Sequence, residues 1–524
     1  MSTLSKFIQS GSTQQYPVLD NPVLLCDFYK VAHPVQYPKN TETVFSTWIP
    51  RGSRLKNVNK VVTFAIQAFI KKYLIDYFNV HFFGRPKAEI IYEYQEYIYF
   101  TLVNPGNIAE LTEQELEDEI LKVDTSRISE LHDLGYMPIK IRALKEGTLV
   151  PLRVPMATFV NTDKRFFWLT NYLETLFSNE DWLPVTTATI AWEYLKLFTH
   201  YATLTCENLD HIPFQGHDFS MRGMAALEAS MAGGAGHLLS FWGTDTCPAI
   251  NYLRRFYNAN YRKEIIGTSV PATEHSVMCA NGKNEREVIK RLITEVHPSG
   301  IASIVSDTWD FWHLVTKVYP SLKDEIMNRD GKVVIRPDSG DPVLILVGDP
   351  NAEVEHVRKG LIECLWDTFG GTINDKGFKV LDPHIGAIYG DSITLERAEH
   401  ILQGLMKKGF ASSNVVLGIG SYTYQYNTRD TFMFAIKASF VIINGEEHLI
   451  YKDPKTDDGT KKSLKGLCVV IRDRDGELTV KDGLNAAEHK KYADLDLLED
   501  VFIDGKLVRD QTLSEIRQLL HSQL

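Results

Sequence analysis

The chain is poor in cysteine, and its six cysteines form no Cys-x-x-Cys pair. Scattered single cysteines disfavour both a structural zinc site and a secreted disulfide scaffold. Residues 1–7 contain no apolar signal core, and no apolar stretch is long enough to span a bilayer. These absences predict a cytoplasmic, reduced protein that is not embedded in a membrane.

Several common catalytic signatures are also missing from the sequence. There is no Walker loop, no complete Gly-x-Gly-x-x-Gly, no His-Glu-x-x-His and no Gly-x-Ser-x-Gly. We therefore do not expect the protein to belong to the classes of enzyme that these motifs define. The net charge of −11 disfavours a nucleic-acid-binding surface, but a few arginines in one pocket would still bind an anionic small molecule.

The composition is globular, with 44% hydrophobic and 23% charged residues, and 524 residues are too many for one ordinary core. In the middle of the chain, apolar runs alternate with amphipathic helices, which is typical of a parallel sheet covered by helices. We predict an irregular α/β barrel over residues 166–429. The expected strands are 301–305, 333–335, 385–389 and 415–417, and the expected helices are 284–296 (with a capping box from Asn284 to Glu287), 309–318, 352–369 and 394–407.

The two ends of the chain have a different character. Helices are expected at 64–78 and 111–123, and short strands at 139–141, 148–150 and 158–160. The tail contains two hairpin turns, Asp475-Gly476 and Asp504-Gly505, and a last helix that opens with the capping box Thr512-Leu-Ser-Glu515. We predict that residues 1–165 and 430–524 pair into one discontinuous, β-rich mixed domain.

Polar residues follow nearly every predicted strand of the middle region. Strand ends often carry Asp, Ser and Gly merely to turn the chain and to cap the next helix. Six such ends in series, with two arginines among them, instead favour an active site, because strand ends of a barrel meet on one rim. The six ends carry Asp245 (after the run 238–242), the His275 segment, Ser306 and Asp310, Arg336 and Asp338, Gly390 and Asp391, and Gly418, Gly420 and Ser421.

These residue types suit a phosphorylated sugar beside an aromatic base. Arg222, Arg336 and Arg429 can hold phosphate oxygens bidentately. Aspartates can accept hydrogen bonds from sugar hydroxyls, and Phe219 offers a stacking face. His275, at the end of a Pro-interrupted extended run, can be a proton carrier, a metal ligand or a phosphate acceptor. The lack of metal-ligand spacing disfavours a zinc role.

From about Pro22 to the last helix, the chain resembles the nicotinamide phosphoribosyltransferase family of type II phosphoribosyltransferases. Many motifs carry the resemblance, and they stand in the family's order. They are Asp27-Phe-Tyr29-Lys30-Val-Ala-His33 with Gln36-Tyr37-Pro38, His217-Asp-Phe219-Ser-Met-Arg222-Gly223, Gly243-Thr-Asp245-Thr, Ser269-Val-Pro-Ala-Thr-Glu-His275-Ser276, Val305-Ser306-Asp-Thr-Trp-Asp310, Ile335-Arg336-Pro-Asp338-Ser-Gly340, Gly390-Asp391, Thr428-Arg429-Asp430 and Lys452-Asp453-Pro454.

The resemblance implies transfer of phosphoribose from phosphoribosyl pyrophosphate to nicotinamide by a homodimer with shared active sites. It implies Mg²⁺, and ATP as a co-substrate that phosphorylates His275. The implied catalytic residues are His275, Asp338 and Asp245. The implied ligands of nicotinamide are Phe219, Asp245 and Arg336, with Tyr29 from the second subunit. Those of ribose and phosphate are Arg222, Arg336, Asp338, Gly390, Asp391, Gly420, Ser421, Arg429 and Lys437, and those of pyrophosphate or ATP are Arg51, Arg222, His275, Arg336, Lys452 and Lys461.

Two departures and two alternatives stand beside this interpretation. The family's glycine run after the late strand reads Gly418-Ile-Gly420-Ser421-Tyr here, and Phe214 replaces a tyrosine that the family often has before the His-Asp-Phe motif. One alternative is a nicotinate-specific phosphoribosyltransferase. The other is a non-catalytic homologue used for binding or signalling, which the intact set of Arg, Asp and His positions disfavours.

Overall fold

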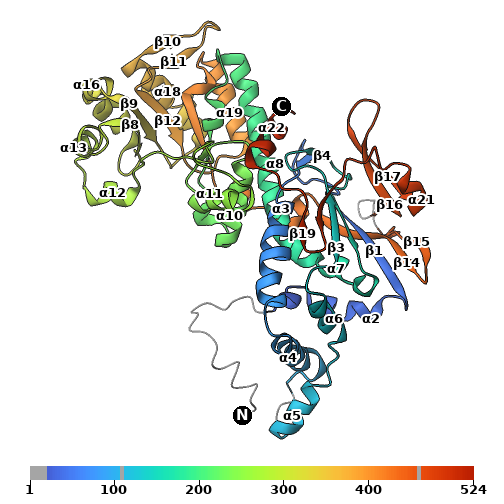
Figure 1. Cartoon of the computed structure of the whole chain (residues 1–524). Helices are drawn as coiled ribbons and strands as arrows, with labels where there is room; N and C mark the ends of the chain where they lie inside the picture. Colours follow the sequence, from blue (N-terminus) through green and yellow to red (C-terminus); the bar gives the residue numbers. More distant parts are fainter. Residues whose placement is uncertain (1–20, 107–110, 457–461) are drawn as a thin grey trace.

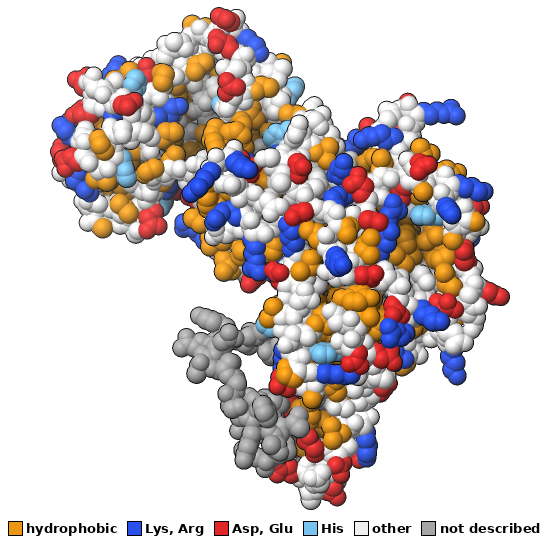
Figure 2. Space-filling model, in the orientation of Figure 1, with side chains coloured by type: hydrophobic (Ala, Val, Ile, Leu, Met, Phe, Trp, Pro, Cys, Tyr) orange, Lys and Arg blue, Asp and Glu red, His pale blue; other side chains and the backbone are white. Residues whose placement is uncertain are grey.

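The computed structural model describes residues 21–106, 111–456 and 462–524. Figure 1 shows a parallel sheet with its helices at the upper left and an antiparallel sheet at the right. The long helix α8 (Glu174–Thr205) runs between them. Figure 2 shows acidic and basic side chains interspersed over the visible face. Within the described residues, no helix has both the length and the apolarity that crossing a membrane requires.

Six parallel strands form the predicted sheet of the middle region. The buried strand residues are mostly apolar because helices cover this sheet, which is the usual state of parallel strands. In spatial order the strands are β7 (Gly243–Thr244), β6 (Gly216–Asp218), β13 (Val415–Ile419), β12 (Ile385–Tyr389), β9 (Asp330–Arg336) and β8 (Ser299–Val305).

The extended segment 268–273 joins the two edges of this sheet. At one end, the backbone N–H of Thr244 donates to the Thr268 carbonyl at 2.9 Å. At the other end, the N–H of Thr273 donates to the Ser303 carbonyl of β8, also at 2.9 Å. A segment that bridges both edges makes the curled sheet an irregular barrel, so the predicted fold class is confirmed.

The helices around the barrel mostly follow the predicted alternation. One expected feature differs, because Asn284 precedes α13 without a side-chain capping hydrogen bond, so the predicted capping box is wrong. The strand at Asp245 is also shorter than the apolar run suggests, because residues 238–240 form a turn and the strand β7 begins only at Gly243. The helices are α10 (Leu227–His237), α11 (Cys247–Phe256), α12 (His275–Ala280), α13 (Glu285–Arg291), α14 (Phe311–His313), α17 (Pro342–Val347), α18 (Glu355–Phe369), α19 (Leu395–Lys407) and α20 (Ser421–Tyr424).

The second sheet is built from both ends of the chain. Strand β1 pairs antiparallel with β14, and β3 pairs with β18, so N-terminal and C-terminal segments share one sheet as predicted. The exact boundaries at 165 and 430 stay a prediction. The strand order is β15 (Glu446–Leu449), β14 (Ala435–Ile443), β1 (Thr41–Ile49), β5 (Ala157–Asn161), β3 (Ile139–Ala143), β18 (Glu499–Ile503) and β19 (Lys506–Leu507).

Smaller elements complete this part. The hairpin at Asp475-Gly476 joins β16 to β17, and the Thr512 capping box opens α22 as expected. The helix expected at 64–78 is α3, continued by further helical turns to residue 83. The bounds are β2 (Lys60–Val62), β4 (Leu149–Pro151), β16 (Leu467–Arg472), β17 (Leu478–Leu484), α3 (Ile66–Phe69), α4 (Lys87–Ile98), α5 (Glu113–Ile120), α6 (Ser126–Leu134), α21 (Ala486–Lys490) and α22 (Leu513–His521).

Helix α8 is the main element that the sequence analysis missed. Its first half contributes Phe177 and Val185 to the core under the antiparallel sheet, and its second half contributes Tyr194 and Phe198 to the barrel core. A helix buried on several sides has no clear apolar stripe, so its periodicity is weak. Pro184 lies inside the helix and further weakens the helical signal of the sequence, because proline normally interrupts a helix.

Candidate active site

The carboxyl ends of the parallel strands carry most of the predicted site residues on one rim. Phe219 follows β6, and Asp245 follows β7. Arg336 ends β9, and His275 is the first residue of α12 after the bridging segment. Barrel enzymes build their sites at this end of the strands. The other predicted residues on this rim are Arg222, Asp338, Gly390, Asp391, Gly420 and Ser421.

A histidine and two aspartates form the tightest cluster on the rim. The Nε2 atom of His275 lies 3.0 Å from Oδ1 of Asp307, and Oδ2 of Asp307 accepts the backbone N–H of Asp338 at 3.0 Å. One ligand atom from each of the three residues lies within 4.8 Å of the others. The arrangement can therefore hold a cation or orient a ring nitrogen of His275.

Asp307 is a residue that sequence analysis missed, although it lies inside a quoted motif and only two positions after the end of β8. The neighbouring residues that the sequence suggested have structural roles. Ser306 is buried, with its hydroxyl 2.8 Å from that of Tyr319, and Asp310 accepts the backbone N–H of His313 as the cap of α14. Their position after a strand points to this stretch of the chain. Choosing among Ser306, Asp307 and Asp310 also requires the directions of the side chains, which the sequence does not give.

The environments of the two aspartates in this cluster differ. Burial alone would raise the pKa of Asp307, but hydrogen bonds from Ser339, the Asp338 backbone and His275 outweigh it and hold that pKa below its usual range. Burial raises the pKa of Asp338 against the opposing charge of Arg336. Asp307 is thus held as an anion. Asp338 is more basic and can accept hydrogen bonds from hydroxyl groups or bind a cation.

Asp245 is held by two donors on the same oxygen. Its Oδ1 lies 2.9 Å from Nε2 of His217 and accepts the Ser269 hydroxyl at 2.5 Å. Burial opposes ionisation of Asp245, but the bonds from His217 and Ser269 and the charge of Arg336 lower its pKa overall. The His217 ring lies 4.6 Å, centroid to centroid, from that of Phe219. Asp245 therefore presents an ionised acceptor beside an aromatic face.

Arg336 and Gly390 border the same space. The guanidinium of Arg336 donates to the Thr273 carbonyl at 2.6 Å, and its Nε lies 3.3 Å from Oδ2 of Asp338. A Cβ atom added at Gly390 would lie 2.4 Å from Oδ1 of Asp338, so any other residue at position 390 would displace that carboxylate. Asp391, the next residue, is exposed.

The late loop and the Arg222 turn approach each other closely. A Cβ atom added at Gly223 would lie 2.0 Å from Oγ of Ser421. Ser421 begins the four-residue helix α20, and Gly420 precedes it in extended conformation. Arg222 is exposed beside Gly223. The contact brings the predicted phosphate loop next to the exposed head group of Arg222, a suitable arrangement for an anion.

A second group of predicted residues lies on the antiparallel sheet instead. Arg51 and Lys437 line one cavity of about 200 Å³, together with Arg153 and Lys462, which sequence analysis missed. Lys462 adjoins the predicted Lys461, which lies outside the described residues. Nothing local in the sequence points to Arg153, since a backbone bond to Pro50 brings it there. Four basic side chains around one cavity suit a phosphate or pyrophosphate.

Two further predicted cations lie near this part of the chain. The backbone N–H of Lys452 donates to the Ser463 hydroxyl at 2.8 Å, and the Ser463 N–H donates to the Lys452 carbonyl at 2.9 Å. Ser463 lines the cationic cavity. Arg429 is exposed and lies 3.2 Å from its neighbour Asp430. Neither side chain lines the cavity in this single chain.

Tyr29 borders a neighbouring hollow of about 390 Å³ that also contains Lys30 and Glu174. The Tyr29 ring is 59% exposed, which suits a stacking partner for a ligand outside this chain's own core. Glu174 connects the two hollows, because it lies 2.8 Å from the buried Lys30 ammonium and 3.4 Å from that of Lys437.

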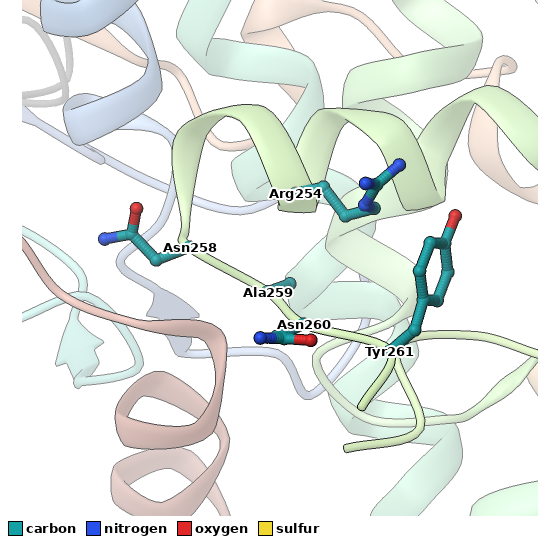
Figure 3. Close-up of a pocket in the computed structure, with 5 residues that line it drawn as sticks. All are labelled: Arg254, Asn258, Ala259, Asn260 and Tyr261. Carbon is teal, nitrogen blue, oxygen red and sulfur yellow. The ribbon is translucent and has the colours of Figure 1, made fainter. Parts of the chain in front are cut away.

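A third hollow, of about 320 Å³, lies beside the end of α11 and contains none of the predicted site residues. In Figure 3 the amide of Asn258 points away from Arg254 and Tyr261, whose guanidinium and ring lie 4.5 Å apart. Asn258, Ala259, Asn260, Arg254 and Tyr261 line it.

Comparisons with known proteins agree with this geometry. Residues 214–501 match the nicotinate phosphoribosyltransferase (NAPRTase) family, and residues 21–81 match the nicotinamide phosphoribosyltransferase N-terminal domain. A relative from Acinetobacter baylyi, named nicotinamide phosphoribosyltransferase, is 48% identical, over 96% of this chain and 98% of its own. One of the same name from Xanthomonas campestris is 33% identical, over 95% and 98%. In fold, the chain is similar to a nicotinate-nucleotide pyrophosphorylase from Pyrococcus furiosus, with a TM-score of 0.59, 13% identity and 98% of each chain covered.

Proposed function

Because the chain belongs to the nicotinate phosphoribosyltransferase (NAPRTase) family, we propose that it transfers phosphoribose from phosphoribosyl pyrophosphate to nicotinamide. The products are nicotinamide mononucleotide and pyrophosphate, a step of NAD salvage. The observation that carries the choice of nicotinamide is the ionised Asp245 carboxylate beside Phe219, because an anion there accepts from an amide and repels the carboxylate of nicotinate.

The rim residues suit the chemistry at the anomeric carbon. The ring nitrogen of nicotinamide forms the new bond to that carbon, while the bond to pyrophosphate breaks and its electron pair leaves with the pyrophosphate. Positive charge builds on the ribose, and Asp338 and Asp391 would stabilise it. Arg222 and Arg336 would hold the departing pyrophosphate, and Gly390 leaves room for the sugar. Ser421 and Gly420 would bind the 5′-phosphate.

Mg²⁺ would arrive with the pyrophosphate. The carboxylates of Asp307 and Asp338 fit it, because Mg²⁺ prefers oxygen ligands and the two side chains already converge with His275. The ion would offset the charge on the pyrophosphate oxygens. Asp338 would in addition keep one oxygen available for ribose hydroxyls.

ATP would act by phosphorylating His275. Since Nε2 faces Asp307, the proton belongs on Nε2, and Nδ1 keeps the free electron pair. Nδ1 would take the terminal phosphoryl group of ATP as the bond to ADP breaks. The added charge of about −1.5 to −2, as for other phospho-residues, would organise the arginines before pyrophosphate leaves.

The active unit would be a homodimer with shared sites. The rim and the cationic cavity lie on different sheets of one chain. The second group of predicted residues would therefore complete the rim of a second copy. These residues are Tyr29, Arg51, Arg429, Lys437, Lys452 and Lys461. Mixing an Asp338→Asn chain with an Arg51→Ala chain should restore activity, because one site of the mixed dimer has both intact halves. A fully active monomer in light scattering would contradict the shared site.

The decisive experiment compares product formation from nicotinamide and from nicotinate, with phosphoribosyl pyrophosphate present. We expect a clear preference for nicotinamide, while a preference for nicotinate would overturn the role of Asp245. Absence of product from either base would favour a non-catalytic homologue.

The six unpaired cysteines suit a reduced, cytoplasmic location, which cell fractionation would test.

A further inference from the structure

We propose that His217 and Ser269 are positioning residues that fix one oxygen of Asp245, so that its other oxygen selects a carboxamide over a carboxylate. The inference rests on the proposed function and adds two residues to its specificity. It starts from the convergence of two donors on a single atom, Oδ1 of Asp245, from two different segments of the barrel.

The two bonds fix the rotation of the Asp245 carboxylate. Nε2 of His217 comes from β6, at 2.9 Å, and the Ser269 hydroxyl comes from the bridging segment, at 2.5 Å. The backbone N–H of Asp245 also donates to the Asp218 carbonyl at 2.9 Å. Within the described residues, Oδ2 makes no hydrogen bond, and the Asp245 side chain is 43% exposed. One oxygen is thus held, and the other remains for a ligand.

The local backbone leaves room for this arrangement. A Cβ atom added at Gly243 would lie 2.6 Å from Nδ1 of His217, so glycine at that position allows the imidazole to reach Asp245. The same ring lies against Phe219, the predicted stacking face for the base. His217 therefore contacts both Phe219, which would stack on the pyridine ring, and Asp245, which would bind the amide substituent of that ring.

Charge then decides which substituent fits. A neutral His217 that donates from Nε2 leaves the pair with the single negative charge of Asp245. Arg336 lies close enough to lower the pKa of Asp245, and its guanidinium can supply an N–H donor. One acceptor and one donor match a carboxamide, which has an N–H and a C=O. A carboxylate has no N–H and would meet the charge of Oδ2, so it is rejected.

His217→Leu tests the histidine, and His217→Gln is its matched variant, because the Gln amide keeps a donor but not the ring. We expect His217→Leu to raise the KM for nicotinamide about tenfold, the size of one lost hydrogen bond, with little change in kcat. The preference for nicotinamide over nicotinate should fall by a similar factor, and His217→Gln should recover most of both.

Ser269→Ala provides a second variant should His217→Leu fold poorly, with Ser220→Ala as its control. Ser220 lies on the same rim, and its buried hydroxyl has no hydrogen-bond partner within the described residues. Ser269→Ala should weaken the preference, while Ser220→Ala should not. Unchanged preference in folded His217→Leu and Ser269→Ala, or equal losses in His217→Leu and His217→Gln, would overturn the inference. If the wild type transfers phosphoribose to neither base, the proposed function fails instead.

Discussion

Nε2 of His275 lies 3.0 Å from Oδ1 of Asp307, a carboxylate whose side chain is only 5% exposed. The other oxygen of Asp307 accepts the backbone N–H of Asp338. One buried anion therefore connects the proposed phosphate acceptor with the proposed sugar ligand. Glu274, the sequence neighbour of His275, instead accepts the hydroxyl of Ser276. The orienting partner comes from the end of another strand, not from the adjacent position.

Asp307→Asn should slow phosphorylation of His275 by about 100-fold, the usual effect of losing a well-placed acid–base partner. The amide lacks the charge that keeps the proton on Nε2, so Nδ1 no longer has its electron pair reliably free. The measurement is incorporation of the labelled terminal phosphate of ATP into the protein. His275→Ala should abolish both incorporation and ATP-dependent stimulation while the fold stays intact.

Asp310→Asn is the matched control, because asparagine caps a helix as well as aspartate does and Asp310 caps α14. Its phosphorylation rate should equal that of the wild type. Equal rates in Asp307→Asn and the wild type would mean that Asp307 does not orient His275. ATP stimulation that survives in His275→Ala would remove the phosphohistidine from the scheme.

The alternation of apolar runs and amphipathic helices was enough to predict the barrel, because each parallel strand has its own local signal. Strand 385–389 is predicted at its observed bounds for this reason. The antiparallel sheet was predictable only as a pairing of the two ends. Its register, which places Lys437 opposite Thr47, depends on contacts almost 400 positions apart in the chain. No local pattern encodes such a register.

The same distinction holds for the candidate site. Residues at strand ends are predictable because the fold gathers such ends on one rim: Asp245 follows β7, Asp338 comes just after β9, and His275 follows the bridging segment. Asp307 and His217 were missed because their roles depend on side-chain direction toward residues about 30 positions away. Arg153 was missed because only the tertiary fold brings it into the cavity beside Arg51.

Lys437→Arg should flatten the pH dependence of phosphoribosyl pyrophosphate binding. Burial lowers the pKa of Lys437, with Glu174 opposing the shift and Arg51 and Lys30 adding to it. A lysine with a lowered pKa loses its charge earlier as pH rises, so the KM should increase about tenfold toward alkaline pH as one charged hydrogen bond is lost. Arginine stays charged throughout.

The KM for phosphoribosyl pyrophosphate would be measured between about pH 7 and 10, the range in which a perturbed lysine titrates. Lys196→Arg, at an exposed lysine on α8 that pairs with Glu193, is the control and should keep the wild-type curve. The idea fails if the curve of Lys437→Arg also coincides with that of the wild type.

Asp181→Asn should stabilise the protein near neutral pH. The Asp181 carboxylate is fully buried on α8, and neither oxygen has a hydrogen-bond partner within the described residues. Burial raises its pKa well above the usual range, and Glu146 and Glu180 add to the shift. The folded state therefore holds a proton that the unfolded state releases above about pH 4, so stability falls as pH rises beyond that point.

The gain in Asp181→Asn should reach about 1–3 kcal/mol at pH 7, the range for a buried unsatisfied polar group, and should vanish below about pH 4. Thermal unfolding of both proteins at several pH values measures it. Asp210→Asn, at an exposed position, should show no such trend. A gain that is the same at pH 4 and pH 7 would mean that the ionisation of Asp181 is not its cause.

Gly223→Ala should weaken binding of phosphoribosyl pyrophosphate by displacing Ser421. The new methyl group would lie 2.0 Å from Oγ and 2.6 Å from Cβ of Ser421, so the loop at the end of β13 must move. Ser421 is also one of the two departures from the family pattern described in the sequence analysis. Ser421→Gly in the Gly223→Ala background removes both clashing atoms, so the double variant should recover much of the lost affinity.

A double-mutant cycle on the KM for phosphoribosyl pyrophosphate tests this contact, because residues in direct contact couple by about 0.5–3 kcal/mol. Gly223→Ala alone should raise the KM by about tenfold or more, and Ser421→Gly alone should have a smaller effect, since it keeps the backbone N–H groups that a phosphate uses. Additive effects would show that the two loops do not constrain each other. Strong coupling would instead mean that the serine requires glycine at position 223, so the departure at Ser421 changes the packing of the loop while leaving its backbone donors available to the phosphate.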